Sequence, residues 1–377
     1  MINVLQLTDY LPDYPGNFGN TLIYISKKLK ETNNIFIVTF PEKKKWHEEI
    51  LKYNGKVFYI TVKKFKEKKI DINAIKLCNE IIKKNNIDLV HVHFGLSQKI
   101  WTIFLKLLNP KLKVVWHWRG DLEKRNFPRS LLRKFFYNFI GNYFINIHIT
   151  NSANITKRLI SNNIILRNKI FTLPNAINLE QFINYTYKNN IEDFKKKYNL
   201  EGKFVLLQIR NFRKRVDFSI IIDALKILQE YEDIVLIWVG YGETEKIIKK
   251  KVKKLGLNNI LFIGKQNNTV PFYYLSHVNL VAWEPWCNET INNSVYEALA
   301  CKRPVIGFNF GGLPLAFKEN EGVIFSSLDP KDYANKILFV KRNYETVLKN
   351  VEIGYEKIKR LYSLEVYVKK LIKIYIS

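Results

Sequence analysis

Short apolar runs alternate with amphipathic stretches along almost the whole chain, and this alternation constrains the fold more than any other feature. Apolar runs bounded by polar residues are typical of strands buried in a parallel sheet. The amphipathic stretches between them are typical of helices that cover such a sheet. The sequence therefore predicts repeated βα units, and an α/β fold with parallel sheets.

The pattern forms two series separated by an interruption. The first series predicts helices such as Thr21–Lys30 and Ala74–Lys84, and strands at Val4–Leu7, Ile35–Phe40, Val57–Val62, Leu89–Phe94, Val114–Trp118 and Ile145–Thr150. The second predicts helices such as Ile220–Glu230 and Glu243–Leu255, and strands at Phe204–Ile209, Ile234–Val239, Ile260–Ile263, Leu280–Trp283 and Val305–Phe308. Between them, Phe171–Gly202 contains a turn and a stretch rich in lysine and asparagine, which predicts a hinge.

A chain of 377 residues is long enough for two domains. We predict Rossmann-like domains over residues 1–180 and 181–355, followed by a closing helix within residues 356–377. Ligands of open α/β sheets bind beyond the carboxyl ends of the strands, so two facing sheets predict a central cleft with one substrate on each side.

Composition limits the class of protein. Three cysteines without metal-ligand spacing indicate neither a disulfide framework nor a metal site, and favour a reducing cytoplasm. No apolar run reaches 18 residues, and the first residues have no signal-peptide pattern. The formal net charge of +27 has two open interpretations. It favours association with an anionic surface such as nucleic acid, acidic phospholipid or a phosphorylated substrate, or it reflects a composition rich in lysine, asparagine and isoleucine.

Two motifs follow predicted strands of the first domain. Gly16 and Gly19 lie between the first strand and a helix, where glycines allow close backbone approach and free N–H groups can bind a phosphate oxygen. Their spacing is not that of a dinucleotide fingerprint. His91 and His93 lie at the end of one strand, and His117 at the end of the next. Such a histidine is either structural or functional. We interpret His91 and His93 as mainly structural, and His117 as a candidate functional residue.

Further motifs end strands of the second domain. Four cations within six residues, Arg210, Arg213, Lys214 and Arg215, follow the strand at Phe204–Ile209. Their mutual repulsion at a strand's carboxyl end favours an anion there, and a departing nucleoside diphosphate is such an anion. Segments containing Gly240, and Lys265 with Gln266, end the next two strands.

The stretch Glu289–Pro304 contains two glutamates separated by seven residues. We expect Glu297 to begin a helix and Glu289 to lie on the loop before it. A carboxylate at such a junction can accept hydrogen bonds from a sugar or ribose, and the helix N-terminus attracts phosphate. The spacing alone is weak evidence. The continuation through Pro304 into Gly311, Gly312 and Pro314 strengthens it.

Together these motifs resemble those of glycosyltransferase family 4, whose members have the GT-B fold. The resemblance covers nearly the whole chain and is strongest over Phe204–Pro314. It implies a retaining transfer from a nucleotide diphosphate sugar to a hydroxyl of a glycan or lipid-linked acceptor, in bacterial polysaccharide, lipopolysaccharide or glycoconjugate synthesis. No cofactor and no metal is implied. UDP is favoured over GDP on family frequency alone. A closing helix that returns to the first domain is also usual in this fold.

The resemblance also assigns roles to residues. Glu297 is expected to bind the ribose hydroxyls and Glu289 the sugar hydroxyls. His117 is expected to contact the donor sugar or the acceptor. Lys214, with either Arg210 or Arg213, is expected to neutralise the diphosphate. Backbone groups are expected to contribute at the diphosphate (Gly16 or Gly19), at the base pocket (Gly240, Lys265, Gln266), and at the sugar and phosphate (Thr290, Ile291, Asn292, Asn293).

The chain departs from the family in three places. Trp118 and Arg119 separate His117 from Gly120, Asn292 stands where most members have glycine, and Leu315 stands where most have glutamate. The identity of the donor sugar is therefore left open.

Apolar pairs at residues 131/132, 135/136 and 139/140 predict an amphipathic helix, and Lys124, Arg125 and Arg129 precede it. The stripe favours a core-facing helix, while the basic flank favours contact with anionic lipid at the inner face of the plasma membrane. Two other functions stay open: a sugar-nucleotide epimerase of the same fold, and a basic nucleic-acid-binding protein. Since none of the usual nucleic-acid recognition signatures is present, we predict no nucleic-acid partner.

Overall fold

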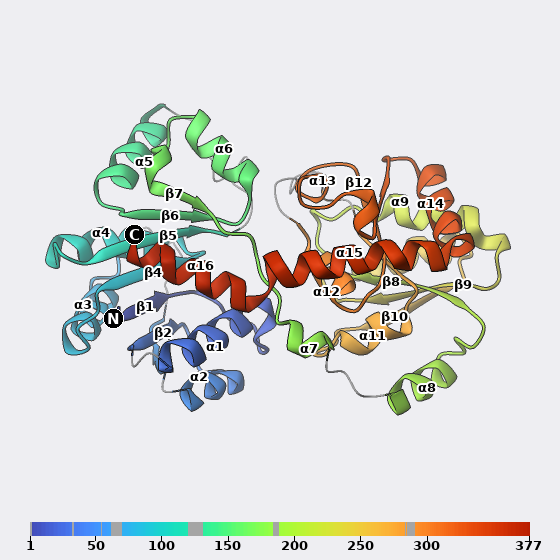
Figure 1. Cartoon of the computed structure of the whole chain (residues 1–377), viewed down its shortest axis with the longest axis horizontal. Helices are drawn as coiled ribbons and strands as arrows, with labels where there is room; N and C mark the ends of the chain where they lie inside the picture. Colours follow the sequence, from blue (N-terminus) through green and yellow to red (C-terminus); the bar gives the residue numbers. More distant parts are fainter. Residues whose placement is uncertain are drawn as a thin grey trace. The chain divides into compact units, whose positions relative to one another are not determined.

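Two parallel sheets organise the chain (Figure 1). The computed structural model describes residues 2–31, 34–53, 55–61, 70–119, 131–183, 188–282, 284 and 291–377. The contacts divide the chain into an N-terminal unit, made of Met1–Ala176 and Leu364–Ser377, and a C-terminal unit, Ile177–Ser363. The final helix thus belongs with the first unit, although it follows the second in the sequence.

The sheet of the N-terminal unit has the strand order β3-β2-β1-β4-β5-β6-β7, with parallel pairing throughout its described strands. Its strands are β1 (Val4–Leu7), β2 (Phe36–Phe40), β3 (Lys56–Tyr59), β4 (Leu89–His93), β5 (Lys113–Trp118), β6 (Ile147–Thr150) and β7 (Ile170–Thr172). Its helices are α1 (Gly16–Lys30), α2 (Glu48–Lys52), α3 (Ile72–Lys84), α4 (Leu96–Leu108), α5 (Leu131–Tyr143), α6 (Ala153–Ser161) and α16 (Leu364–Ile376).

Side chains alternate between the two faces of this sheet, as the period of a strand requires. Leu5, Val90 and Trp116 pack on the face covered by α3, α4 and α6. Val4 and Val115 pack on the face covered by α1, α2 and α16. Figure 1 shows α16 (red) lying along the sheet near α1 (blue), with which it is in contact.

The sheet of the C-terminal unit has the order β10-β9-β8-β11-β12-β13 and is also parallel. Its strands are β8 (Phe204–Ile209), β9 (Ile234–Val239), β10 (Ile260–Gly264), β11 (Val278–Leu280), β12 (Val305–Phe308) and β13 (Val323–Ser326). Its helices are α7 (Leu179–Ile183), α8 (Lys188–Lys197), α9 (Ser219–Ile227), α10 (Glu245–Lys254), α11 (Val270–Leu275), α12 (Asn293–Ala300), α13 (Leu313–Ala316), α14 (Pro330–Arg342) and α15 (Tyr344–Tyr362).

In each sheet the strand order reverses at one position. The N-terminal sheet reverses between β1 and β4, and the C-terminal sheet between β8 and β11. The helices that follow the two flanking strands cover opposite faces at such a point, which leaves room beyond the carboxyl ends of the strands. These two edges are therefore the first places to look for binding residues.

The structure places several elements differently from the sequence prediction. Helix α1 begins at Gly16 rather than Thr21, and α15 continues to Tyr362, so the closing helix begins at Leu364. Strand β11 spans Val278–Leu280 rather than Leu280–Trp283. The buried polar Asn279 interrupts the apolar run there, which displaced the predicted strand. Among the described residues, no helix combines the length and the apolar character that a membrane crossing requires.

Candidate functional site

Three histidines gather at the carboxyl edge of the N-terminal sheet. His91 and His93 belong to β4 and His117 to β5, and the strand period points all three toward the face covered by α16. His91 Nε2 lies 3.2 Å from His117 Nδ1. Burial is the main cause that lowers the pKa of all three imidazoles well below the ordinary histidine value, and the nearby Arg119 cation lowers it further. They are therefore neutral at pH 7.

Residues outside these strands complete the cluster. Tyr375 of α16 places its hydroxyl 2.6 Å from His91 Nδ1 and 3.0 Å from the side-chain nitrogen of Gln6. The side-chain oxygen of Gln6 lies 2.6 Å from His93 Nε2, and Arg119 Nε donates to His93 Nδ1 at 3.1 Å. His117 Nε2 is buried and has no hydrogen-bond partner among the described residues.

The three histidines are close enough to raise the question of a metal ion, because one ligand atom of each lies within 4.8 Å of the others. The chemistry of the donor set argues against one. Both ring nitrogens of His91 and of His93 are engaged in hydrogen bonds, as is Nδ1 of His117. Only His117 Nε2 is left to ligate, and Arg119 adds a positive charge beside the group. The arrangement is a hydrogen-bonded cluster.

The two glycines of the first motif lie in the first turn of α1. Gly16 adopts a φ of +53°, and a Cβ there would lie 2.7 Å from the hydroxyl oxygen of Tyr10. A Cβ on Gly19 would lie 2.7 Å from Pro15 and 3.0 Å from the ring of Trp46. Both positions need glycine for a packing reason, so the functional role of either glycine stays a prediction.

At the edge of the C-terminal sheet, the basic loop after β8 divides into two parts. Arg210 forms an ion pair with Glu284, which follows β11 and is 9% exposed. This pair spans the point where the strand order reverses. Arg213 and Lys214 are exposed, and the side chain of Glu243 accepts a hydrogen bond from the backbone N–H of Lys214 at 3.0 Å. Arg210 therefore has a carboxylate partner within the protein, while Arg213 and Lys214 present their charges to solvent.

The turn after β9 lies against this loop. A Cβ on Gly240 would lie 2.0 Å from the carbonyl oxygen of Arg210, and one on Gly242 would lie 2.4 Å from that of Phe212. Glycine at both positions lets the two loops touch through their backbones. After β10, the ammonium of Lys265 lies 5.3 Å from the ring centre of Tyr241. The side chain of Gln266 donates to the carbonyl of Ile263 in β10. The predicted base-pocket residues thus come from adjacent loops.

Glu297 lies in the middle of α12, four residues after its first residue, Asn293. The prediction that Glu297 begins this helix was therefore wrong, because the cap lies upstream: the side chain of Asn292 accepts from the backbone N–H of Ser294 at 3.2 Å. The hydroxyl of Tyr273 donates to Glu297 Oε2 at 2.7 Å. Burial raises the pKa of this carboxyl, and the Tyr273 hydrogen bond partly offsets the rise.

Of the remaining predicted residues, some lie within the described part of the chain and some lie outside it. Ile291 packs against the core of the C-terminal unit, and Asn293 begins α12. Glu289 and Thr290 lie outside the described residues, as does the basic stretch from Lys124 to Arg129. Their predicted roles stay predictions.

Four residues of these two edges escaped the sequence reasoning: Gln6, Tyr273, Glu284 and Tyr375. Glu284 had a usable signal, since it follows a predicted strand of the second domain. Gln6 also had one, as the polar residue of an otherwise apolar first strand. Tyr273 and Tyr375 had none, because they are aromatic residues in apolar helices that ordinary packing would explain.

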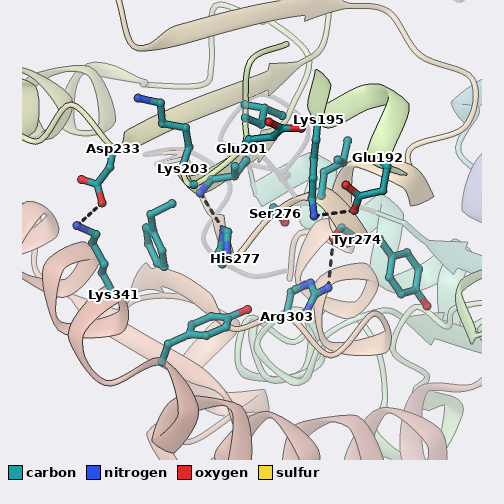
Figure 2. Close-up of a pocket in the computed structure, with 16 residues that line it drawn as sticks. Glu192, Lys195, Glu201, Lys203, Asp233, Tyr274, Ser276, His277, Arg303 and Lys341 are labelled. Carbon is teal, nitrogen blue, oxygen red and sulfur yellow. Dashed lines mark hydrogen bonds and ion pairs between the residues drawn. The ribbon is translucent and has the colours of Figure 1, made fainter. Parts of the chain in front are cut away.

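A hollow of about 890 Å³ opens at the opposite edge of the C-terminal sheet (Figure 2). Its lining includes Phe204 at the start of β8, and Asp233 and Arg303 just before β9 and β12. Two of its lysines are paired, Lys341 with Asp233 at 2.5 Å and Lys195 with Glu192 at 2.9 Å. It lies at the amino ends of the strands and is separate from the predicted donor residues.

Two sequence models of known families match the chain. The sequence model described as Glycosyltransferase Family 4 matches residues 19–181, and the one described as Glycosyl transferases group 1 matches residues 190–357. The chain belongs to glycosyltransferase family 4. In this family 4 member the first match lies in the N-terminal unit except for residues 177–181, and the second lies wholly in the C-terminal unit.

Curated relatives of this family 4 protein are distant. The N-acetyl-alpha-D-glucosaminyl L-malate synthase of Bacillus anthracis is 27% identical over 244 residues, which is 62% of this chain and 60% of that protein. An uncharacterised glycosyltransferase of Methanocaldococcus jannaschii, MJ1178, is 26% identical over 75% of this chain and 74% of its own length. The match thus spans less than two thirds of the Bacillus protein.

Solved structures establish the GT-B fold of this family 4 protein. A glycosyltransferase from Rickettsia africae superposes with a TM-score of 0.83 at 20% identity, covering 99% of this chain and 97% of that one. HepE of Anabaena, in complex with UDP and glucose, superposes with a TM-score of 0.80 at 14% identity, covering 99% of both chains.

Proposed function

We propose that this protein transfers a sugar from a nucleotide diphosphate sugar, UDP-linked in preference to GDP-linked, to a hydroxyl acceptor with retention of configuration. The observation that carries the proposal is the gathering of unlike groups at one edge of the C-terminal sheet. Exposed cations follow β8, a glycine turn follows β9, and α12, which carries the hydrogen-bonded Glu297, follows β11. A diphosphate needs the cations to neutralise its charge, and the ribose hydroxyls need the carboxylate of Glu297 to accept their hydrogen bonds.

Each group has a role that its chemistry suits. Arg213 and Lys214, which are exposed, neutralise the diphosphate as negative charge develops on the leaving group. The second oxygen of Glu297, which receives no hydrogen bond among the described residues, accepts from the ribose hydroxyls. Arg210 forms an ion pair with Glu284 and so fixes the position of the loop that carries Arg213 and Lys214. Glu289, in a retaining transfer, holds the sugar hydroxyls.

Two features support the choice of donor and chemistry. Family membership implies a nucleotide sugar, and HepE of Anabaena was solved with UDP-glucose and with UDP. In a retaining reaction on one face of the sugar, the leaving phosphate takes the acceptor proton. The side chains at the donor edge supply positive charge and hydroxyl-binding groups, which this reaction needs.

The acceptor is a hydroxyl of a glycan or of a polyprenyl- or other lipid-linked sugar, in bacterial glycan synthesis at the cytoplasmic face of the membrane. Support comes from α5, on which Phe139 and Tyr143 are 52% and 73% exposed and stack at 5.7 Å. Ile140 of the same helix is buried, so one face of α5 enters the core and the other presents aromatic rings. The basic residues that precede α5 in the sequence suit an anionic lipid surface.

Vesicle sedimentation tests this attachment. The protein should bind vesicles that contain phosphatidylglycerol and not those of phosphatidylcholine alone. Phe139→Ser with Tyr143→Ser should weaken that binding, while Leu107→Ser, which changes a similarly exposed residue of α4, should not. Equal binding to both kinds of vesicle, or an unaffected double variant, would contradict attachment through α5.

The donor proposal is tested by a thermal-shift panel of UDP, GDP, ADP, TDP and their sugar derivatives, without metal and then with magnesium. A ligand that binds only the folded protein raises the melting temperature by mass action. We expect UDP and a UDP-sugar to do so in the wild type and in Glu230→Gln, an exposed site on the same unit, and not in Glu297→Gln. A shift that survives Glu297→Gln would contradict the ribose assignment.

Product analysis separates the remaining alternatives. The anomeric configuration of the product, read by NMR, should match that of the donor, and inversion would contradict the mechanism. Interconversion of free sugar nucleotides without an acceptor would favour an epimerase. Salt-sensitive binding of RNA or DNA, without any nucleotide-sugar binding, would favour the nucleic-acid interpretation of the charge.

A further inference from the structure

A continuous line of hydrogen bonds runs from Arg119 to His117 inside the N-terminal unit. Its five links measure 3.1, 2.6, 3.0, 2.6 and 3.2 Å. The side chains between its ends are at most 2% exposed, so water does not substitute for any link. In order, the members of this relay are Arg119, His93, Gln6, Tyr375, His91 and His117.

The first member fixes the direction of the relay. A guanidinium only donates hydrogen bonds, so His93 Nδ1, which faces Arg119 Nε, accepts. His93 is neutral, because burial and the neighbouring cations lower its pKa. Its single ring proton therefore lies on Nε2. That nitrogen donates to the carbonyl oxygen of Gln6, which fixes the orientation of the Gln6 amide independently of how its oxygen and nitrogen were assigned.

The same reasoning fixes the proton positions of Tyr375, His91 and His117. The amide nitrogen of Gln6 donates to the Tyr375 oxygen, so the one hydroxyl proton of Tyr375 points to His91 Nδ1. His91, also neutral, then carries its proton on Nε2 and donates it to His117 Nδ1. His117 in turn carries its proton on Nε2, which is the buried nitrogen without a partner.

We propose that this relay holds His117 as a neutral imidazole whose Nε2–H donates a hydrogen bond to an oxygen of the substrate, with Tyr375 and Gln6 as its positioning residues. The assignment of a substrate contact rests on the function proposed above, whereas the tautomers do not. His117 is then a donor and not a base, because its Nδ1 accepts from His91 and its Nε2 holds the proton.

Two physical points favour this role. A buried N–H without a partner costs about 1–3 kcal/mol, and a ligand oxygen at that position removes the cost. Because His117 is 0% exposed, the side chains that cover its Nε2 must move aside before a substrate oxygen can make this contact. Arg119 also lies beside the cluster and opposes any additional proton on its histidines, so the neutral form persists over the physiological range. Tyr375 is 284 positions from His91 in the sequence, and α16 brings its hydroxyl into the relay.

The tautomers can be read directly from long-range 1H–15N spectra of the full-length protein labelled with 15N-histidine. The wild type should show the Nε2–H form for His91, His93 and His117 at pH 7, assigned by single His→Gln variants. An Nδ1–H form or an imidazolium at His117 would overturn the proposal. This measurement on the wild type needs no variant to be active.

Two tyrosines of α16 provide a matched pair for the positioning role. Tyr375→Phe removes the hydroxyl that sets His91, so the signals of His91 and His117 should shift toward a mixture of tautomers while that of His93 stays. Tyr367→Phe removes a hydroxyl that accepts a hydrogen bond from Arg119 Nη2 at 3.0 Å, outside the relay, and should leave both signals unchanged. Unchanged His117 signals in Tyr375→Phe would overturn the role of Tyr375.

Turnover separates the failure of this inference from that of the proposed function. Tyr375→Phe should lower kcat roughly five- to tenfold with little change in the KM for the nucleotide sugar. The variant loses the hydrogen bond from Tyr375 to His91, which holds His117 in the tautomer with its proton on Nε2. If the tautomers are as stated and His117→Gln keeps full turnover, the substrate contact is wrong and the relay is structural. If nucleotide binding at Glu297 fails while the tautomers hold, the proposed function fails alone.

Discussion

The hydroxyl of Tyr273 donates a 2.7 Å hydrogen bond to Glu297 Oε2, and so joins α11 to α12 in the C-terminal unit. Burial raises the pKa of Glu297, and this hydrogen bond stabilises the ionised carboxylate and pulls the pKa back down. The bond engages one carboxylate oxygen, and the other receives no hydrogen bond among the described residues. Tyr273 thereby couples the packing of two helices to the charge of the predicted ribose-binding residue.

Tyr273→Phe should raise the pKa of Glu297 further, because it removes the interaction that lowers it. Nucleotide binding that needs the ionised carboxylate weakens as pH falls through this pKa. The weakening should therefore begin at a higher pH in Tyr273→Phe than in the wild type. Calorimetric titration with UDP from pH 8 to pH 5 measures it. Superimposable pH profiles would show that Glu297 does not bind the nucleotide as a carboxylate.

Replacing Arg210 by alanine and replacing Arg213 by alanine should have different effects on folding stability and on nucleotide binding. Arg210→Ala leaves Glu284 nearly buried without its ion-pair partner, which costs about 3 kcal/mol of folding free energy. Arg213→Ala should leave stability unchanged and weaken nucleotide binding, since Arg213 is exposed. Urea denaturation and UDP titration of both variants distinguish the two. The reverse pattern would make Arg210 the phosphate-binding residue.

Lys214→Ala should lower kcat/KM for the nucleotide sugar by roughly tenfold or more, because the charge that stabilises the leaving diphosphate is lost. Lys250→Ala removes the same charge from an exposed position on α10 and should have little effect. Initial-rate kinetics at two salt concentrations compare them. Equal losses in the two variants would mean that only the general positive field of the protein matters.

Gly354→Ala tests the packing of α15. Alanine is the better helix former, yet a Cβ at Gly354 would lie 2.1 Å from the carbonyl oxygen of Glu321. The backbone conflict should outweigh propensity and destabilise the protein by more than about 2 kcal/mol. Ile353→Ala, at an exposed neighbouring position, serves as the control and should be nearly neutral. Denaturant unfolding measures both, and a stabilised Gly354→Ala would contradict the contact.

Acid should unfold the N-terminal unit before the C-terminal unit. All six histidines have pKa values below the ordinary value, chiefly because of burial, and five belong to the N-terminal unit: His47, His91, His93, His117 and His148. His277 belongs to the other unit. The folded pKa is about 4 for His47 and about 3 for His148. Unfolding lets each group take up a proton below about pH 6.5.

Above about pH 6.5 these histidines are neutral in both the folded and the unfolded chain, and the free energy of unfolding does not depend on their protonation. As pH falls from about 6.5 toward 4, the free energy of unfolding decreases by up to about 1.4 kcal/mol per pH unit for each histidine. Hydrogen exchange followed by mass spectrometry, at intervals from pH 7 to pH 4.5, should show peptides of β1, β4 and β5 losing protection before those of β8 and β9. Simultaneous loss in both sheets would contradict the prediction.

Strands that are mainly apolar were predicted well. The predicted bounds of β1, β8, β9 and β12 agree with the structure. The prediction missed β7, whose three residues run into the predicted hinge, and β13, which is four residues long. It also placed the start of α1 too late, because Gly16 and Gly19 resemble a loop when their tertiary contacts are unknown.

The sequence by itself determined the α/β class, the order of the elements and the placement of the motif residues near the carboxyl ends of strands, because the strand period and the parallel sheet fix these locally. The tertiary structure decided which side chains meet there. Tyr273 lies 24 positions from Glu297, and Tyr375 lies 284 positions from His91. Such pairs are set by how helices pack on the sheets and carry no local pattern, so only the folded chain reveals them.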